Sequence, residues 1–199
     1  AHDFNNLLFT ILGNIALAGG GDELEPDTRS FLGEAHKAAR KAQALTKKLI
    51  TFSKGGTPIR KTGDIEPLLR EIVKEGGTGP DVICSLWTAP DLYPAVFDHG
   101  QMNHALRNIV TNAAEAMENK GTIIIDAKNE TIPAGNDGQV PPGEYVRISI
   151  SDLGCGIPEE NQSKIFDPYF STKQAGSQKG MGLGLATTYS IITKHEGFV

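Results

Sequence analysis

The first 53 residues repeat apolar side chains at spacings of three and four, and this period constrains the fold more than any other feature of the chain. The first run comprises Phe4, Leu8, Ile11, Ile15 and Ala18. The second run comprises Phe31, Ala35, Ala38, Ala42, Leu45, Leu49 and Phe52. A period of about 3.5 residues is typical of helices that supercoil or pack into bundles. Residues 2–53 are therefore predicted to form two helices.

The segment GGGDELEPD separates the two runs and predicts a turn. Its glycines can end the first helix, and Pro26 suits the first turn of the second. A single helical hairpin leaves its apolar stripe exposed, so we expect a second copy to cover it in a homodimeric four-helix bundle. The alternative is that the hairpin packs on the rest of its own chain.

Residues 54–63 (KGGTPIRKTG) have the composition of a linker, and mixed patterns follow in residues 64–199. Helices are predicted at 65–75, at 98–117 with Asp98 as the N-cap, and at 183–194. Strands are predicted at 82–87, 95–97, 122–128 and 145–152. The fold class is α+β: the helical hairpin of residues 1–53, followed by an α/β sandwich with one mixed sheet and a helical layer.

Composition excludes several classes of protein. Apolar residues make up 39% of the 199 positions and charged residues 22%, which is enough to build a core. No apolar run approaches the ~20 residues of a membrane-spanning helix, and no signal peptide is visible, so we expect no membrane contact from these residues. Cys84 and Cys155 lie far apart and match no metal or redox spacing, so we expect a reducing, cytoplasmic compartment. A net charge of −5 argues against nucleic acid as the main partner.

The segment NIVTNAAEAM places Asn108 and Asn112 one turn apart on the predicted long helix. Two amides on one face could contact phosphate oxygens and a magnesium ion, which takes oxygen ligands. Taken alone, however, the pair is more typical of a solvated helix face.

The segment ISISDLGCGIP places Asp152 at a strand end, followed by Gly154 and Gly156. A carboxylate there could accept a hydrogen bond from the exocyclic amine of adenine, while glycine allows close approach of a ligand to the backbone. The alternative is an ordinary Asx turn.

The segment KGMGLGLATTYSI places Gly180, Gly182 and Gly184 directly before an apolar helix, where backbone N–H groups can bind phosphate. It matches neither the Walker nor the Rossmann pattern. Lys173 and Lys179, in the preceding polar loop, could reach a polyphosphate or could simply be solvated.

The order of these segments is more specific than any one of them. An Asn-bearing helix, D-x-G-x-G-I-P, F-D-P-Y-F-S-T-K and G-x-G-L-G-L together resemble the ATP-binding domain of sensor histidine kinases over residues 65–197. That domain shares its fold with DNA gyrase, MutL and heat-shock chaperone ATPases. Residues 2–53 resemble the dimerisation and phosphoacceptor hairpin of the same kinases, with HDFNNLL similar to the phosphoacceptor motif of nitrogen-regulation-type and hybrid kinases.

The resemblance implies roles for three residues of the hairpin. His2 would accept the phosphoryl group, since a neutral imidazole nitrogen is a competent nucleophile near neutral pH. Asp3 would accept the proton of the other ring nitrogen. Asn6, one turn after His2, would position water against the phosphoaspartate of a partner.

The resemblance also implies ATP and Mg²⁺ as cofactors. Asn112 would hold the magnesium ion and Asn108 would contact the phosphate region. The implied nucleotide-binding residues are Asn108, Asn112, Asp152, Gly154, Gly156, Lys173, Gly182 and Gly184. Two departures stand out: Met181 replaces a threonine of many relatives, and relatives continue past HEGFV through two more strands.

The expected function is therefore an ATP-dependent protein-histidine kinase that phosphorylates His2 and passes the phosphoryl group to a response-regulator receiver aspartate. One alternative is a hydrolysing ATPase of the gyrase or MutL type, whose glutamate base would stand where this chain has Asn108. A second alternative is a dimeric ATP-binding sensor or phosphatase without kinase activity.

Overall fold

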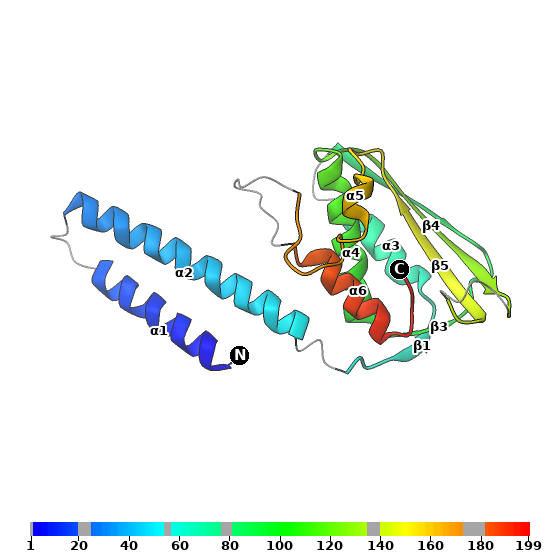
Figure 1. Ribbon diagram of the computed structural model, residues 1–199, viewed down its shortest axis with the longest axis horizontal. Helices are drawn as coiled ribbons and strands as arrows, with labels where there is room; N and C mark the ends of the chain where they lie inside the picture. Colours follow the sequence, from blue (N-terminus) through cyan, green and yellow to red (C-terminus); the bar gives the residue numbers. More distant parts are fainter. Residues whose placement is uncertain (1, 20–24, 54–56, 77–80, 135–139, 173–181) are drawn as a thin grey trace. The chain divides into compact units, whose positions relative to one another are not determined.

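The computed structural model describes residues 2–19, 25–53, 57–76, 81–134, 140–172 and 182–199 (Figure 1). The chain divides into two compact units, residues 1–55 and residues 56–199. Within the first unit, side chains are described for residues 8–19, 25–40 and 42. Across all the residues that the structure describes in both units, no helix is long and apolar enough to cross a membrane.

The first unit consists of two helices, α1 (His2–Gly19) and α2 (Pro26–Ser53), that lie side by side. Pro26 is the first residue of α2, as the sequence predicts. Leu8, Leu12 and Ala39 are buried between the helices. Part of the apolar stripe stays exposed in the single chain, including Phe31, whose exposed fraction is 71%.

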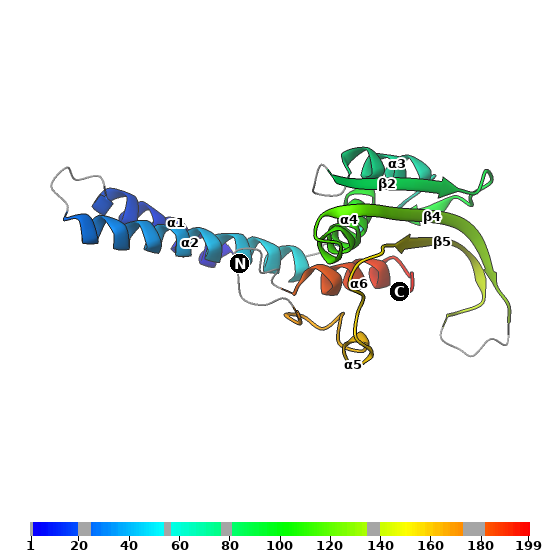
Figure 2. The same cartoon turned by 90° about the horizontal axis from the view of Figure 1, so that it is seen from above.

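The second unit has the predicted helical layer on one side of a mixed sheet. Its elements are β1 (Lys61–Gly63), α3 (Glu66–Glu75), β2 (Asp81–Thr88), β3 (Ala95–Phe97), α4 (His99–Ala116), β4 (Lys120–Ile132), β5 (Gly143–Ser151), α5 (Glu159–Gln162) and α6 (Gly184–Lys194). The main sheet has the order β2-β4-β5, which Figure 2 shows from above. Helices α3, α4 and α6 lie on one side of it (Figure 1).

The main sheet combines two kinds of pairing. Strands β2 and β4 run parallel, with Asp81 opposite Lys120, and the chain between them contributes β3 and α4. Strands β4 and β5 form an antiparallel pair with Ile124 opposite Ser151. Apolar side chains from the sheet and from α3 and α4 form the core, and the largest fully buried ones are Leu68, Leu69, Ile123 and Ile125. This core fixes α4 against the sheet.

The segment expected to be a linker ends in a strand, which corrects the prediction for residues 61–63. Lys61 to Gly63 form β1, which pairs antiparallel with β3 as a separate two-stranded sheet. The three residues Lys-Thr-Gly carry no apolar alternation, so their strand conformation comes from pairing with β3 rather than from local preference. The short helix α5 was likewise not predicted.

Candidate functional site

Helix α4 is the central element of the candidate site, and its start is fixed by Asp98. The Asp98 carboxylate accepts a hydrogen bond from the Gln101 backbone N–H at 3.0 Å, which confirms the predicted N-cap. It also accepts one from the Ile59 N–H at 2.8 Å. Donation from the backbone N–H of Gln101 first, and then of Ile59 and Gly100, holds the pKa of the Asp98 carboxyl below its usual value.

The first half of the site joins α4 to the start of α6. The Asn108 side-chain Nδ2 donates a hydrogen bond to the carbonyl oxygen of Gly184 at 3.2 Å. Gly184 is the first residue of α6, and a Cβ there would stand 3.8 Å from the Asn108 Cγ. Two residues that lie far apart in the sequence, and that the motifs single out separately, are therefore in contact.

The second half of the site joins the end of α4 to the loop after β5. The Cys155 N–H donates to the Ala116 carbonyl at 3.1 Å, and a Cβ on Gly154 would lie 2.6 Å from that same oxygen. Only glycine permits this approach. The exposed Asp152 accepts a hydrogen bond from the Gly154 N–H at 2.8 Å through one carboxylate oxygen, which makes an Asx turn.

Asn108, Asn112 and Ala116 follow one another at intervals of four residues and therefore share one face of α4. Gly184 contacts one end of this face and the Asp152 loop contacts the other, about 12 Å away at the rise of an α-helix. Asn112 lies between them, half-buried, and its carboxamide has no hydrogen-bond partner among the residues that the structure describes. The arrangement is a strip of helix surface flanked by two glycine-bearing loops.

Two further glycines are required for different reasons. Gly182 has a φ of +62°, and a Cβ there would lie 2.4 Å from the Phe170 carbonyl oxygen. Its own carbonyl accepts a hydrogen bond from the Tyr169 N–H at 2.9 Å, which joins the F-D-P-Y-F segment to the residues preceding α6. Gly156 has a φ of +70° in open space, so there glycine serves the backbone conformation alone.

Four predicted site residues have no described side chain. Lys173 lies outside the described residues. His2, Asp3 and Asn6 belong to α1, and their side chains are outside the description as well. The prediction that His2 and Asn6 share a helix face agrees with the helical backbone over these positions.

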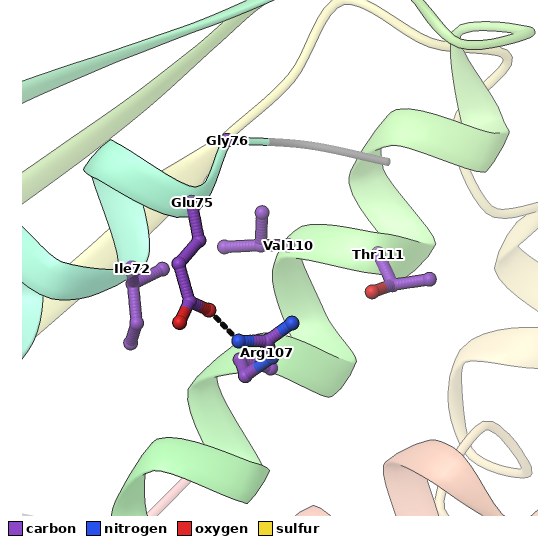
Figure 3. Close-up of a pocket in the computed structure, with 6 residues that line it drawn as sticks. All are labelled: Ile72, Glu75, Gly76, Arg107, Val110 and Thr111. Atoms are coloured by element: carbon purple, nitrogen blue, oxygen red, sulfur yellow. Dashed lines mark ion pairs between the residues drawn. The ribbon is translucent and has the colours of Figure 1, made fainter. Parts of the chain in front are cut away.

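Two hollows in the described part of the second unit lie away from the strip. One, of about 20 Å³, lies between α3 and α4 beside the ion pair of Glu75 with Arg107 (Figure 3). Another, of about 400 Å³, is lined by residues from β1, the end of β3 and the start of α4, including Lys61 and Asp98. Neither of these two hollows contains Asn112 or Asp152 among its lining residues.

No group of three or more His, Cys, Asp or Glu side chains that could hold a metal gathers in the described part of the chain. At the strip, the Asn112 carboxamide oxygen could hold a cation together with water and ligand oxygens. This donor set suits Mg²⁺, which keeps several waters and binds phosphates.

Thr188, a fully buried polar residue of α6 four residues after Gly184, was not predicted to belong to the site. The signal was available, because two adjacent threonines within an apolar helix must find hydrogen-bond partners.

The chain is similar to a family of ATPases and kinases and to several individual proteins. Residues 97–199, just over half of the chain, match the family described as histidine kinase-, DNA gyrase B-, and HSP90-like ATPase. The sensor kinase CckA of Brucella abortus is 32% identical over 210 residues, covering 100% of this chain and 21% of CckA. The sensory histidine kinase/phosphatase NtrB of Rhodobacter capsulatus is 28% identical over 209 residues, covering 100% of this chain and 55% of NtrB.

Among solved structures, full-length ShkA in complex with AMPPNP resembles 97% of this chain with a TM-score of 0.65 and 23% sequence identity, over 39% of its own chain. This likeness supports the fold. The chain thus spans between about a fifth and just over half of the length of these relatives.

Proposed function

The chain belongs to the histidine kinase-, DNA gyrase B- and HSP90-like ATPase family, and on this premise we propose that it is an ATP-dependent protein-histidine kinase of a two-component system. The observation that carries the proposal is the strip on α4, where Asn108 meets Gly184 and Ala116 meets the Asp152 loop. Relatives named as sensor kinases align with the whole chain, including the helical hairpin that bears His2.

ATP would bind along the strip with its base towards Asp152 and its phosphates towards Gly182 and Gly184. One oxygen of the Asp152 carboxylate is used by the Gly154 N–H, and the second is left to accept the adenine amine. The N–H groups at the start of α6 carry the positive end of the helix dipole, which favours phosphate. Lys173 would add a positive charge.

Mg²⁺ fits this site because the half-buried Asn112 offers an amide oxygen between the two loops. When bound, the ion would neutralise negative charge on the phosphates. Asn112 would hold the ion and Asn108 would lie beside the phosphates.

His2 would be the nucleophile. Its ring nitrogen forms the bond to the γ-phosphorus as the bond to the β-phosphate oxygen breaks, which releases ADP. Asp3 would accept the proton from the other ring nitrogen, so that the phosphorylated ring stays neutral. The phosphoryl group would then pass to a receiver aspartate of a response regulator.

The hydrolysing ATPase is the weaker alternative, because it needs a base to take a proton from water. Asn108 stands at the position of that base, and a carboxamide cannot take the proton. Its Nδ2 group is also engaged as a donor to Gly184.

A phosphatase activity is a second candidate function for the same chain. The relative NtrB is named a sensory histidine kinase/phosphatase, and Asn6 follows His2 by one turn of α1. A carboxamide there could orient water against the phosphoaspartate of a docked regulator.

We also propose that the chain acts as a homodimer through its hairpin. Large apolar side chains of α1 and α2 are exposed in the single chain: Phe9, Ile11, Leu17 and Phe31. A second hairpin would cover them in a four-helix bundle.

The test is incubation with γ-labelled ATP and Mg²⁺. The wild-type chain should acquire an acid-labile, alkali-stable label, and His2→Gln should acquire none while still binding ATP. Label retained on His2→Gln would remove His2 from the mechanism. Release of free phosphate without labelled protein would favour the ATPase, and bound but uncleaved nucleotide would favour the sensor.

A further inference from the structure

Thr188 is a polar side chain with no exposed surface, in the second turn of α6. A hydroxyl removed from water is costly unless it finds a hydrogen-bond partner. The Thr188 Oγ1 lies 3.1 Å from the Gly184 carbonyl oxygen and 3.2 Å from the Ala105 carbonyl oxygen. Because a hydroxyl carries one hydrogen, it shares or alternates that hydrogen between the two carbonyls.

These two carbonyls belong to different helices. Gly184 opens α6, whereas Ala105 lies in α4, one turn before Asn108. The preceding residue provides the contrast: the Thr187 hydroxyl donates at 2.7 Å to the Leu183 carbonyl, four residues back along its own chain segment. Thr187 is almost as buried as Thr188, yet the Thr187 bond does not reach α4.

The Gly184 carbonyl is therefore the meeting point of two side chains, Thr188 from α6 and Asn108 from α4. Thr188 connects this point to the backbone of α4 independently of Asn108. If Asn108 turns towards a bound phosphate, the Thr188 link to Ala105 still holds α6 against α4.

We propose that Thr188 is a positioning residue for nucleotide: its buried hydroxyl holds the start of α6, with Gly182 and Gly184, at the right distance from Asn108 and Asn112. This inference rests on the proposed function, in which the start of α6 binds the phosphates of ATP. Thr188 itself would not touch the nucleotide.

The experiment measures the dissociation constant of AMPPNP with Mg²⁺ by calorimetry for the 199-residue chain. Thr188→Val, which keeps the shape and loses the hydroxyl, should weaken binding about fivefold, the scale of one net hydrogen bond. Thr188→Ser should bind within about twofold of wild type. Thr187→Val, the matched control, should also stay within about twofold. Equal binding by folded Thr188→Val, or an equal loss in Thr187→Val, would overturn the proposal.

A second measurement does not depend on nucleotide. The side-chain amide signals of Asn108, observed by NMR without ligand, should shift in Thr188→Val and stay in place in Thr187→Val. Wild-type chain that binds no AMPPNP would refute the proposed function, and unmoved Asn108 signals in Thr188→Val would refute the positioning role. If Thr188→Val does not fold, the comparison of Thr188→Ser with Thr188→Ala isolates the hydroxyl, and equal amide signals and affinities in that pair would refute it.

Discussion

Replacing Asp98 should destabilise the second unit through two hydrogen bonds that its carboxylate accepts. One, from Gln101, caps α4, and removing an N-cap costs about 1 kcal/mol. The other, from the Ile59 N–H, goes to a charged group and adds about 1.5 kcal/mol. Asp98→Ala should therefore lower the free energy of unfolding by about 2–3 kcal/mol at pH 7. Asp98→Asn should cost less than about 1 kcal/mol, since asparagine caps equally well.

The assay is urea unfolding followed by circular dichroism. With a urea dependence of about 2 kcal/mol per molar, Asp98→Ala should unfold at about 1 M less urea. The pH dependence has a definite sign. The pKa of Asp98 is lower in the folded chain than in the unfolded chain. The contribution of Asp98 to the free energy of unfolding is therefore complete above its pKa in the unfolded chain. That contribution is lost as the pH falls through its pKa in the folded chain, below about pH 4.

Wild type should consequently lose more stability than Asp98→Asn between pH 5 and pH 3, a window that follows from the ordinary carboxyl pKa of about 4. If Asp98→Ala unfolds within about 0.3 M urea of wild type, or if Asp98→Asn is as damaging as Asp98→Ala, the assignment of both hydrogen bonds is refuted.

Three further outcomes are expected. Asp152→Asn should weaken ATP binding roughly tenfold to a hundredfold, as measured by calorimetry. It should keep the Asx turn, since an amide oxygen can still accept a hydrogen bond from the Gly154 N–H. Unchanged affinity would contradict the proposal that Asp152 binds the adenine amine. Gly182→Ala should unfold at a clearly lower temperature than Gly156→Ala. Both glycines have a positive φ, but only at Gly182 would the new Cβ also clash with neighbouring backbone. Equal melting temperatures would contradict the close packing inferred for Gly182. In a phosphotransfer assay with a cognate regulator, Asn6→Ala should keep autophosphorylation and lose dephosphorylation, and equal damage to both would exclude a separate role for Asn6.

The sequence predicts those parts of the fold whose signal is local. Asp98 precedes a long helix and caps it, and the β-branched run at 122–128 lies inside β4. Strand β1 was missed because its conformation depends on pairing with β3, which no local pattern encodes.

For the candidate site, too, the sequence predicts what is local and not what depends on packing. Asn108, Asp152 and Gly184 are recognisable from their motifs, but their motifs do not say which of them touch. The contact of Asn108 with Gly184 depends on how α6 packs on α4. Ala116 was not singled out because its contribution is a backbone carbonyl, which any residue supplies.

The parallel pairing of β2 with β4 has a consequence for how the second unit folds. The antiparallel pair of β4 and β5 joins neighbouring segments, whereas β2 and β4 can meet only after the whole of β3 and α4 has been brought back across the sheet. Such non-local closure is the slow step in proteins of this kind, since the chain entropy is lost before the contacts form. Helix α4 is that connection and also carries Asn108 and Asn112, so the pairing of β2 with β4 also brings these two asparagines back to the sheet.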